Sequence, residues 1–355
     1  MKLHCLLPVL TFFLLFVPPA FAQKMPRSSE NDQRFRDYLQ RFPEADADKD
    51  GILSAPEARA HIAERNERRE ERPRRPRGPA PTETDIRYGP HERNVFDLWL
   101  PENAAGEGKS LPVFVFFHGG GFVAGDKSGF DASPYLAAGM AVVSGNYRFV
   151  DGETTFSPVP MRDCARVIQF LRYHAAKWNL DPERFAVGGS SAGAVISMWI
   201  GYRDDLADPD ADDPVARQST RVSCIAPING PTTLDPAWIT PNMGGPPHVH
   251  GALPKLFGGG VEEIAADPEM RALVLDASAM THATKDDPPT LLVYSFELEG
   301  IPLPEDATTG LLIHHPFFGQ ALKEKLDELG VENSFRHGVD PRGTSLIADW
   351  VKERF

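Results

Sequence analysis

The chain is poor in cysteine, has no excess of positive charge, and has one extended apolar run, at its N-terminus. Its 355 residues include three cysteines, and its formal net charge is −13. So few cysteines exclude a small disulfide-built scaffold, and an acidic chain is not expected to bind nucleic acid. Beyond the N-terminal run only Cys164 and Cys224 remain. Their places on a predicted helix and a predicted buried strand favour two buried thiols over a disulfide.

The N-terminus has the three parts of a secretory signal peptide. Lys2 gives a positive start, Leu6–Val17 is apolar, and Ala20-Phe21-Ala22 is a small-residue cleavage site. The apolar segment is short for a membrane anchor, which is the alternative, and no later run is long enough to cross a bilayer. The sequence therefore predicts a signal peptide over residues 1–22, a mature chain from Gln23 with no stable membrane span, and a secreted or periplasmic protein.

Residues 30–65 have the pattern of an EF-hand, in which two helices flank a twelve-residue calcium loop. Asn31–Phe42 has helical periodicity, and a second helix is expected over Ala55–Arg69. In the loop between them, Gly51 falls at the position of the sharp turn. Hard oxygen ligands stand at the calcium positions: Asp46, Asp48, Asp50, the carbonyl of Ile52, Ser54 and Glu57. The spacing predicts a Ca²⁺ site with a structural or regulatory role, and a solvated acidic loop is the alternative. A lone EF-hand is expected to bind weakly, to pair between chains or to pack on the larger domain.

The pattern changes after residue 82. Residues 66–82 are rich in Arg, Glu and Pro and are expected to form an exposed linker. From residue 83 to 355, apolar strand-like runs alternate with amphipathic helical segments. This alternation predicts an α/β domain with a mostly parallel sheet, helices on both faces and a small cap over residues 242–275. Ligand sites in such sheets lie at the carboxyl ends of the strands.

Two glycine-rich segments fall at such strand ends. The first is His118-Gly119-Gly120-Gly121-Phe122, and the second is Gly189-Ser190-Ser191-Ala192-Gly193, which fits G-x-S-x-G. A serine on a strained strand-to-helix turn is a nucleophile for acyl transfer, and neighbouring backbone N–H groups hold the oxyanion. We expect Ser191 to be the nucleophile and the N–H groups of Gly120, Gly121 and Ala192 to form the oxyanion hole.

Residues from about 84 onward resemble the α/β-hydrolase fold, and within it the secreted microbial carboxylesterases related to hormone-sensitive lipase and to feruloyl and acetyl-xylan esterases. Besides the two glycine segments, the matching stretches are Asn146-Tyr147-Arg148, Leu180-Asp181-Pro182-Glu183-Arg184 and Asp287-Pro288-Pro289-Thr290-Leu291. The resemblance implies a serine nucleophile that is activated by a histidine, itself oriented by a carboxylate.

The base and the acid depart from the family pattern. The resemblance places the histidine after the last strand, where His337 follows Ser334-Phe335-Arg336; His314 and His315 are the alternatives. It places the acid after the preceding strand, but Leu298 stands at the usual aspartate position. Glu299 is the favoured acid, and the alternatives are Glu297 and Asp306.

These features predict a secreted serine carboxylesterase that acts on short-chain, acetyl or aromatic esters, including polysaccharide-linked ones. The substrate is a small-molecule or polysaccharide ester, and no cofactor is required for the chemistry. The alternative is a non-catalytic hydrolase-fold protein that serves as a calcium-dependent binding module. The altered sequence after Ser295 motivates that alternative.

Overall fold

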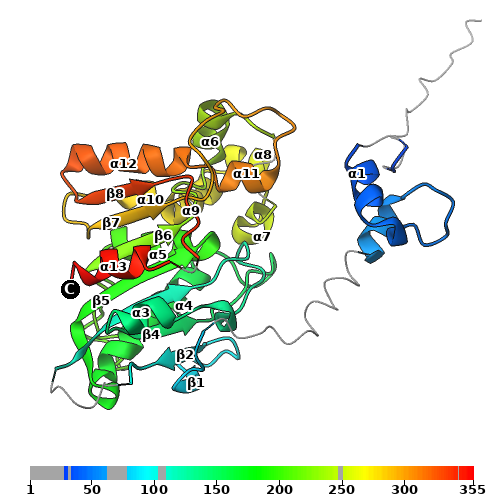
Figure 1. The fold of residues 1–355 in the computed structure, drawn as a ribbon. Helices are drawn as coiled ribbons and strands as arrows, with labels where there is room; N and C mark the ends of the chain where they lie inside the picture. The colour runs from blue at the N-terminus through cyan, green and yellow to red at the C-terminus, as the bar shows by residue number, and fades with distance from the viewer. Residues whose placement is uncertain (1–27, 31–32, 62–77, 103–108, 247–250, 343) are drawn as a thin grey trace, which may run out of the picture. The chain divides into compact units, whose positions relative to one another are not determined.

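The computed structural model describes residues 28–30, 33–61, 78–102, 109–246, 251–342 and 344–355, which belong to two compact units that divide between Arg74 and Arg75 (Figure 1). The predicted signal peptide, residues 1–22, lies outside the described residues, as does most of the predicted linker. Within the described part, no helix has the length and apolar character needed to span a membrane.

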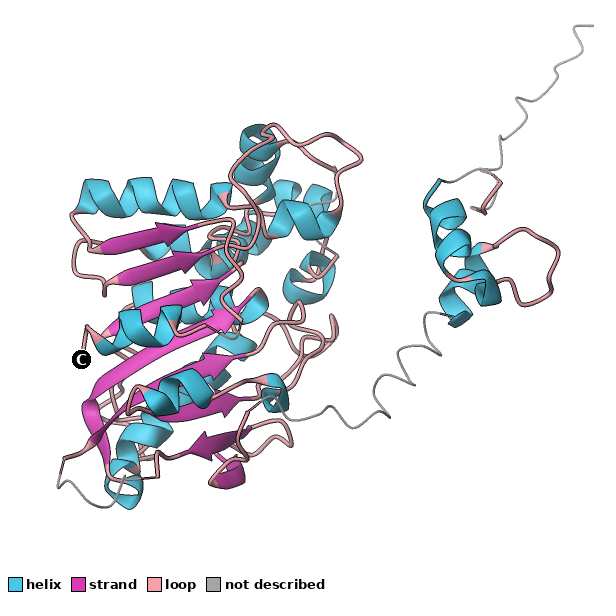
Figure 2. Ribbon diagram, in the orientation of Figure 1, coloured by secondary structure: helices cyan, strands magenta, loops and turns pink. Residues whose placement is uncertain are grey.

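The larger unit is built on one sheet with the strand order β1-β2-β4-β3-β5-β6-β7-β8 (Figure 2). β2 runs antiparallel to both β1 and β4, and every other neighbouring pair is parallel. The strands are β1 (Glu83–Arg87), β2 (Val95–Trp99), β3 (Leu111–Phe117), β4 (Ala141–Gly145), β5 (Leu180–Ser190), β6 (Cys224–Ile228), β7 (Thr290–Val293) and β8 (Asn333–Arg336).

Helices cover both faces of this sheet, because the central strands are apolar on both sides. On one face Val115 and Val187 pack with α4, α5 and α12; on the other, Phe114 and Ala186 pack with α3 and α13. The helices are α3 (Ser133–Ala137), α4 (Val159–Tyr173), α5 (Ala192–Tyr202), α6 (Pro236–Met243), α7 (Leu253–Phe257), α8 (Val261–Ala266), α9 (Pro268–Ala277), α10 (Ala279–His282), α11 (Thr309–Ile313), α12 (Phe317–Leu329) and α13 (Leu346–Lys352).

Local residues explain several boundaries of these helices. Pro134 lies in the first turn of α3, where a missing N–H costs nothing, and Gly139 with φ +85° turns the chain into β4. The proline and the glycine therefore mark the two ends of this helix. Cys164 and Cys224 are buried free thiols, as predicted.

The smaller unit contains α1 (Gln33–Arg41), a 3-10 turn (Pro43–Ala45), a loop and a helical segment over residues 55–61. Ala45, Leu53 and Ala58 form its buried centre, and the apolar face of α1 packs on them. The backbone N–H of Ser29 donates to the carbonyl of Leu53 at 2.9 Å, and Ser29 Oγ accepts from the N–H of Leu53 at 2.8 Å. The segment before α1 therefore pairs with the middle of the loop.

Candidate active site

Ser191 lies on a sharp turn between β5 and α5. Its backbone has φ 55° and ψ −114°, a conformation that is strained for a residue with a side chain. Its N–H donates to the carbonyl of Ile228 at the end of β6, at 2.9 Å. A methyl group at Gly193 would lie 2.0 Å from the carbonyl oxygen of Phe117, and one at Gly189 would lie 2.2 Å from that of Gly193. The turn therefore requires both glycines of G-x-S-x-G.

The first glycine segment lies against this turn. Gly120 and Gly121 have φ values of +115° and +61°, in the region that favours glycine. A methyl group at Gly119 would lie 2.8 Å from the carbonyl oxygen of Ser190 and 3.3 Å from Ser191 Cβ. Within the described residues, the N–H groups of Gly120 and Gly121 donate to no backbone carbonyl. The N–H of Ala192, in the first turn of α5, has no partner within its own helix.

A set of buried and partly buried side chains holds the glycine segment. His118 stacks on Tyr147 with ring centroids 4.4 Å apart, and Tyr147 Oη donates to the carbonyl of His118 at 2.9 Å. Arg93 donates to the carbonyl of Tyr147 at 2.8 Å and to that of Gly125 at 3.1 Å. Tyr147 belongs to a stretch that marks the family resemblance, whereas nothing in the sequence singles out Arg93.

His314 is the histidine that contacts Ser191. Its Nε2 lies 2.9 Å from Ser191 Oγ, a hydrogen-bonding distance between residues 123 positions apart in the chain. The side chain is partly buried, and this burial lowers the pKa of the imidazole below its ordinary value. A neutral ring that accepts the serine proton at Nε2 carries its own hydrogen on Nδ1. No carboxylate of the described residues hydrogen-bonds to that Nδ1.

The loop that carries His314 is fixed on both sides. Before it, Thr308 caps α11 through a hydrogen bond from the N–H of Leu311 at 3.1 Å, and Leu312 is fully buried. After it, the buried ring of His315 accepts from the N–H of Phe317 at 3.1 Å and donates through Nε2 to the carbonyl of Glu299 at 2.9 Å. His315 therefore has both ring nitrogens occupied by backbone partners and holds its neighbour in place.

The structure differs from the expectation that His337 meets Ser191. His337 Nδ1 lies 3.1 Å from Glu297 Oε2, and both side chains are well exposed. Glu299, the expected acid, is exposed and contributes its backbone carbonyl to His315 rather than its carboxylate to a histidine. Asp306 is exposed as well. The physical reason is that α11 brings His314 to the serine turn, while the short β8 ends with His337 at an exposed edge.

One cavity adjoins Ser191, and a second adjoins Ser190 and His314. A small apolar one of about 30 Å³ is lined by Ser191, Gly121 and Ala192 together with core side chains. A larger one of about 500 Å³ is lined by Ser190, Asn229 and His314 among others. A further cavity of about 990 Å³ is lined by residues at the amino ends of β3 and β4, so it lies at the other end of the sheet.

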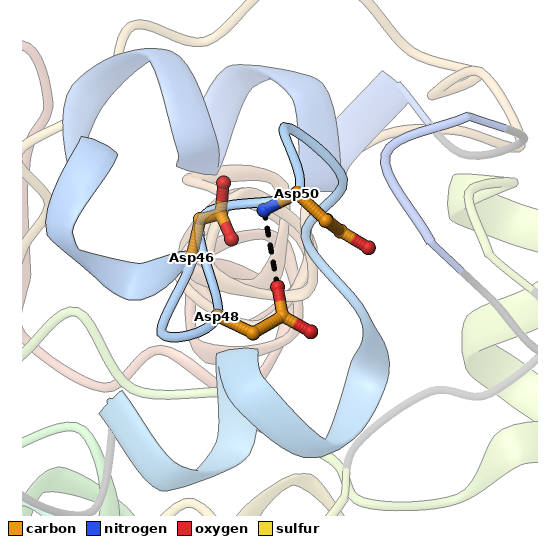
Figure 3. A group of neighbouring side chains, drawn as sticks. All are labelled: Asp46, Asp48 and Asp50. Atoms are coloured by element: carbon orange, nitrogen blue, oxygen red, sulfur yellow. Dashed lines mark hydrogen bonds between the residues drawn. The ribbon is translucent and has the colours of Figure 1, made fainter.

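The smaller unit holds an acidic cluster (Figure 3). Carboxylate oxygens of Asp46, Asp48 and Asp50 lie within 4.8 Å of one another. Gly51, with φ +85°, makes the turn and donates its N–H to Asp46 Oδ2 at 2.9 Å. Glu57 accepts from the hydroxyl of Ser54 at 2.7 Å and from the N–H of Ala47 at 3.1 Å, so it closes the loop. The loop thus has the turn and the acidic positions that its spacing predicts.

A serine turn and a facing glycine loop at the carboxyl ends of a mostly parallel sheet define an α/β-hydrolase fold. The profile of the family described as BD-FAE matches residues 96–303, and the chain belongs to this family.

Among curated proteins, the chain is similar to the probable carboxylic ester hydrolase LipM of Mycobacterium tuberculosis, with 27% identity over 59% of this chain and 46% of LipM. It therefore spans less than half the length of that relative. Among solved structures, a truncated carbohydrate esterase from gut microbiota matches with a TM-score of 0.60 and 19% identity, over 79% of this chain and 98% of the other. An acetyl ester-xyloside bifunctional hydrolase from Caldicellulosiruptor lactoaceticus matches with a TM-score of 0.56 and 22% identity, over 73% and 88%. These similarities support the fold.

Proposed function

We propose that the chain is a secreted serine esterase that hydrolyses short-chain, acetyl or aromatic esters through an acyl-enzyme on Ser191. The observation that carries the proposal is the 2.9 Å contact between His314 Nε2 and Ser191 Oγ. Beside it, the N–H groups of Gly120 and Gly121 donate to no backbone carbonyl of the described residues. A serine hydroxyl is a weak nucleophile until an adjacent base accepts its proton. His314 takes the role of that base in place of His337.

In the first half of the reaction, Ser191 Oγ attacks the ester carbonyl carbon while its proton passes to His314 Nε2. The N–H groups of Gly120, Gly121 and Ala192 stabilise the oxyanion of the tetrahedral intermediate. As the intermediate collapses, His314 gives this proton to the departing alcohol oxygen. Water then repeats the sequence on the acyl-enzyme, with His314 as its base, and releases the acid and free Ser191.

In this proposal Ser191 and His314 form a catalytic dyad, which works without a carboxylate on His314 Nδ1. The ring is oriented by its loop, which Leu312 and His315 fix, rather than by an acid. Burial of the imidazole favours its neutral form, which is the form that accepts a proton. A carboxylate partner also stabilises the imidazolium that forms during the reaction. A dyad is therefore expected to turn over more slowly than a complete triad.

The substrate class follows from the relatives together with the predicted export. The similar structures include a carbohydrate esterase and an acetyl ester hydrolase, and LipM is named as a carboxylic ester hydrolase. A signal peptide would send this chain to a secreted or periplasmic location. Esters of polysaccharides and of their fragments are accordingly the proposed substrates.

Hydrolysis of 4-nitrophenyl acetate by the mature chain tests the proposal. The wild type is expected to turn over, and Ser191→Ala is expected to lose at least about 10⁴-fold in kcat/KM with an unchanged circular dichroism spectrum. Equal rates in the two proteins would overturn the proposed role of Ser191. If the chain is instead a non-catalytic hydrolase-fold binding module, neither the wild type nor Ser191→Ala should hydrolyse 4-nitrophenyl acetate.

For the smaller unit, we propose Ca²⁺ binding in a structural or regulatory role, with no part in the ester chemistry. Asp46 Oδ1 is buried and has no hydrogen-bond partner among the described residues, so it is available as a ligand atom for a cation. Asp46, Asp48, Asp50, Glu57 and the carbonyl of Ile52 would hold the ion, which suits a cation that prefers six to eight oxygens. Because Ser29 already pairs with Leu53 at the loop centre, the EF-hand does not need a second EF-hand at that edge.

A further inference from the structure

We propose that Lys127 is a positioning residue for the oxyanion hole, because a buried ion pair at this residue holds the end of the glycine loop, residues 118–127. This loop follows β3 and contains Gly120 and Gly121, whose N–H groups are proposed to stabilise the oxyanion. It ends where Lys127 begins a 3-10 turn, Lys127–Gly129. The inference rests on the proposed esterase function. It adds a residue that acts through the position of the loop rather than on the substrate.

Lys127 is a buried cation with two carboxylate partners. Its Nζ donates to Asp97 Oδ1 at 2.7 Å and lies 2.9 Å from Asp85 Oδ1. Asp97 is buried in β2, whereas Asp85 is exposed, and the N–H of Asp85 donates to Asp97 Oδ1 at 3.0 Å. Burial opposes the charge on Lys127, but hydrogen bonds to the two carboxylates raise its pKa above the ordinary value. The side chain is therefore a charged link between the loop and β2.

The backbone of Lys127 is hydrogen-bonded on both sides as well. Its N–H donates to Asn146 Oδ1 at 2.7 Å, and its carbonyl accepts from Ser144 Oγ at 2.9 Å. Ser144 lies in β4 opposite Asp97 of β2, so the backbone and the side chain of Lys127 bind two paired residues of the sheet. Asn146 Nδ2 also donates to Asp126 Oδ2 at 2.8 Å. The end of the glycine loop is thus attached to two strands that are hydrogen-bonded to each other.

A shift at Lys127 would reach the proposed oxyanion donors because the glycine loop folds back tightly on itself. Two residues before Lys127, a methyl group at Gly125 would lie 2.3 Å from the carbonyl oxygen of Gly119. The N–H of Ala124 donates to the carbonyl of Gly120 at 3.1 Å. Each of these carbonyls shares a planar peptide unit with the N–H of the next residue, which is a proposed oxyanion donor. The end of the loop therefore sets the direction of both donors.

Loss of the lysine has two separable consequences, one for catalysis and one for stability. Loss of a whole oxyanion donor costs about 10²–10³-fold in kcat, so displacement of donors that remain in the loop should cost about 10-fold to 100-fold. Replacing Lys127 also leaves the carboxylate of Asp97 buried without its cation, which destabilises a folded protein. A test of positioning must therefore distinguish a misplaced loop from a weaker fold.

The experiment measures kcat and KM for 4-nitrophenyl acetate below the melting temperature of each protein. Lys127→Met is expected to lower kcat about 10-fold to 100-fold and to leave KM within about twofold, because the oxyanion forms only in the transition state. Arg354→Met is the control for lost stability. Arg354 is also a mostly buried cation, and its partner Glu332 precedes the amino end of β8, whereas the glycine loop follows the carboxyl end of β3. The control should lower the melting temperature and leave kcat unchanged.

A double variant separates the two consequences and serves as the test if Lys127→Met does not fold. Lys127→Met combined with Asp97→Asn leaves no buried carboxylate without a cation at this position, so its melting temperature should recover toward that of the wild type. Its kcat should stay about 10-fold to 100-fold below the wild-type value, because the link to β2 is still absent. Wild-type kcat in either lysine variant, or a kcat that recovers together with the melting temperature, would overturn the proposal. A wild-type protein that hydrolyses no ester would instead contradict the proposed esterase function.

Discussion

The two sides of the candidate site are built in different ways. On one side, Ser191 and the N–H groups proposed for the oxyanion hole belong to two short segments whose backbone shape is enforced by their own glycines. On the other side, His314 comes from a helix end 123 residues away and is held by Leu312 and His315. The first side depends on local sterics, whereas the second depends on tertiary packing. Local sterics leave a motif in the sequence, and tertiary packing does not.

Replacing the proposed base is expected to give the largest change in activity, and it distinguishes the role of His314 from that of His337. His314→Ala should lower kcat/KM for 4-nitrophenyl acetate by about 10³-fold or more, because His314 is the hydrogen-bond partner of Ser191 Oγ. His337→Ala is the matched control and should stay within about threefold of the wild type, because its partner is Glu297. A larger loss of kcat/KM in His337→Ala than in His314→Ala would show that His337, after β8, is the base.

A methyl group added to the glycine segment that faces Ser191 is expected to lower kcat less than removal of His314 does. In Gly120→Ala the new Cβ would lie 2.0 Å from the carbonyl oxygen of Ala124, at a backbone φ of +115°. The loop must shift, so an oxyanion donor moves and kcat should fall about 10²–10³-fold. Gly139→Ala carries comparable backbone strain, at φ +85°, with no atom within 4 Å of the new methyl. If the control loses as much activity, the effect of Gly120→Ala reports general destabilisation rather than the oxyanion hole.

The pH dependence of kcat/KM gives a smaller and more graded test of the histidine side. His314 must be neutral to accept a proton, so its protonation at low pH removes activity. Burial lowers the pKa of His314 from its model-compound value of 6.5. The acid limb of the profile should therefore have its midpoint below pH 6.5 in the wild type and in His337→Ala alike. A midpoint above that value would show that the base titrates in a different environment.

The smallest effect on catalysis is expected from changes in the acidic loop of the smaller unit, the proposed Ca²⁺ site. Asp46→Asn should abolish Ca²⁺ binding measured by isothermal titration calorimetry and leave kcat/KM within about twofold, because the loop belongs to the other compact unit. Glu44→Gln removes one exposed charge from the same unit outside the loop and should keep Ca²⁺ binding. A large loss of turnover in Asp46→Asn would mean that the smaller unit supports the active site.

The sequence was sufficient for the parts of the molecule that are set by short-range rules. The alternation of apolar runs with amphipathic segments predicts the mostly parallel sheet, and G-x-S-x-G predicts the strained turn at Ser191. The family order of elements predicts that the base follows the last strand. The structure differs from this prediction. His337 does follow β8, but it pairs with Glu297 at an exposed edge.

No pattern in the sequence predicts that α11 brings His314 to Ser191. The pair His314-His315 before α12 was the available signal, and only packing distinguishes the two rings. His315 is buried with both nitrogens bonded to backbone groups, so His314 is left to face Ser191. The supporting role of Arg93 is hidden for the same reason, because its partners Tyr147 and Gly125 lie far from it in the chain.

Intact-mass labelling with a fluorophosphonate tests the Ser191–His314 pair most directly. The account predicts a single adduct on the wild type and on His337→Ala at similar rates, no adduct on Ser191→Ala, and labelling of His314→Ala that is slower by about 10²-fold or more. Rapid labelling of His314→Ala together with loss of labelling in His337→Ala would contradict it.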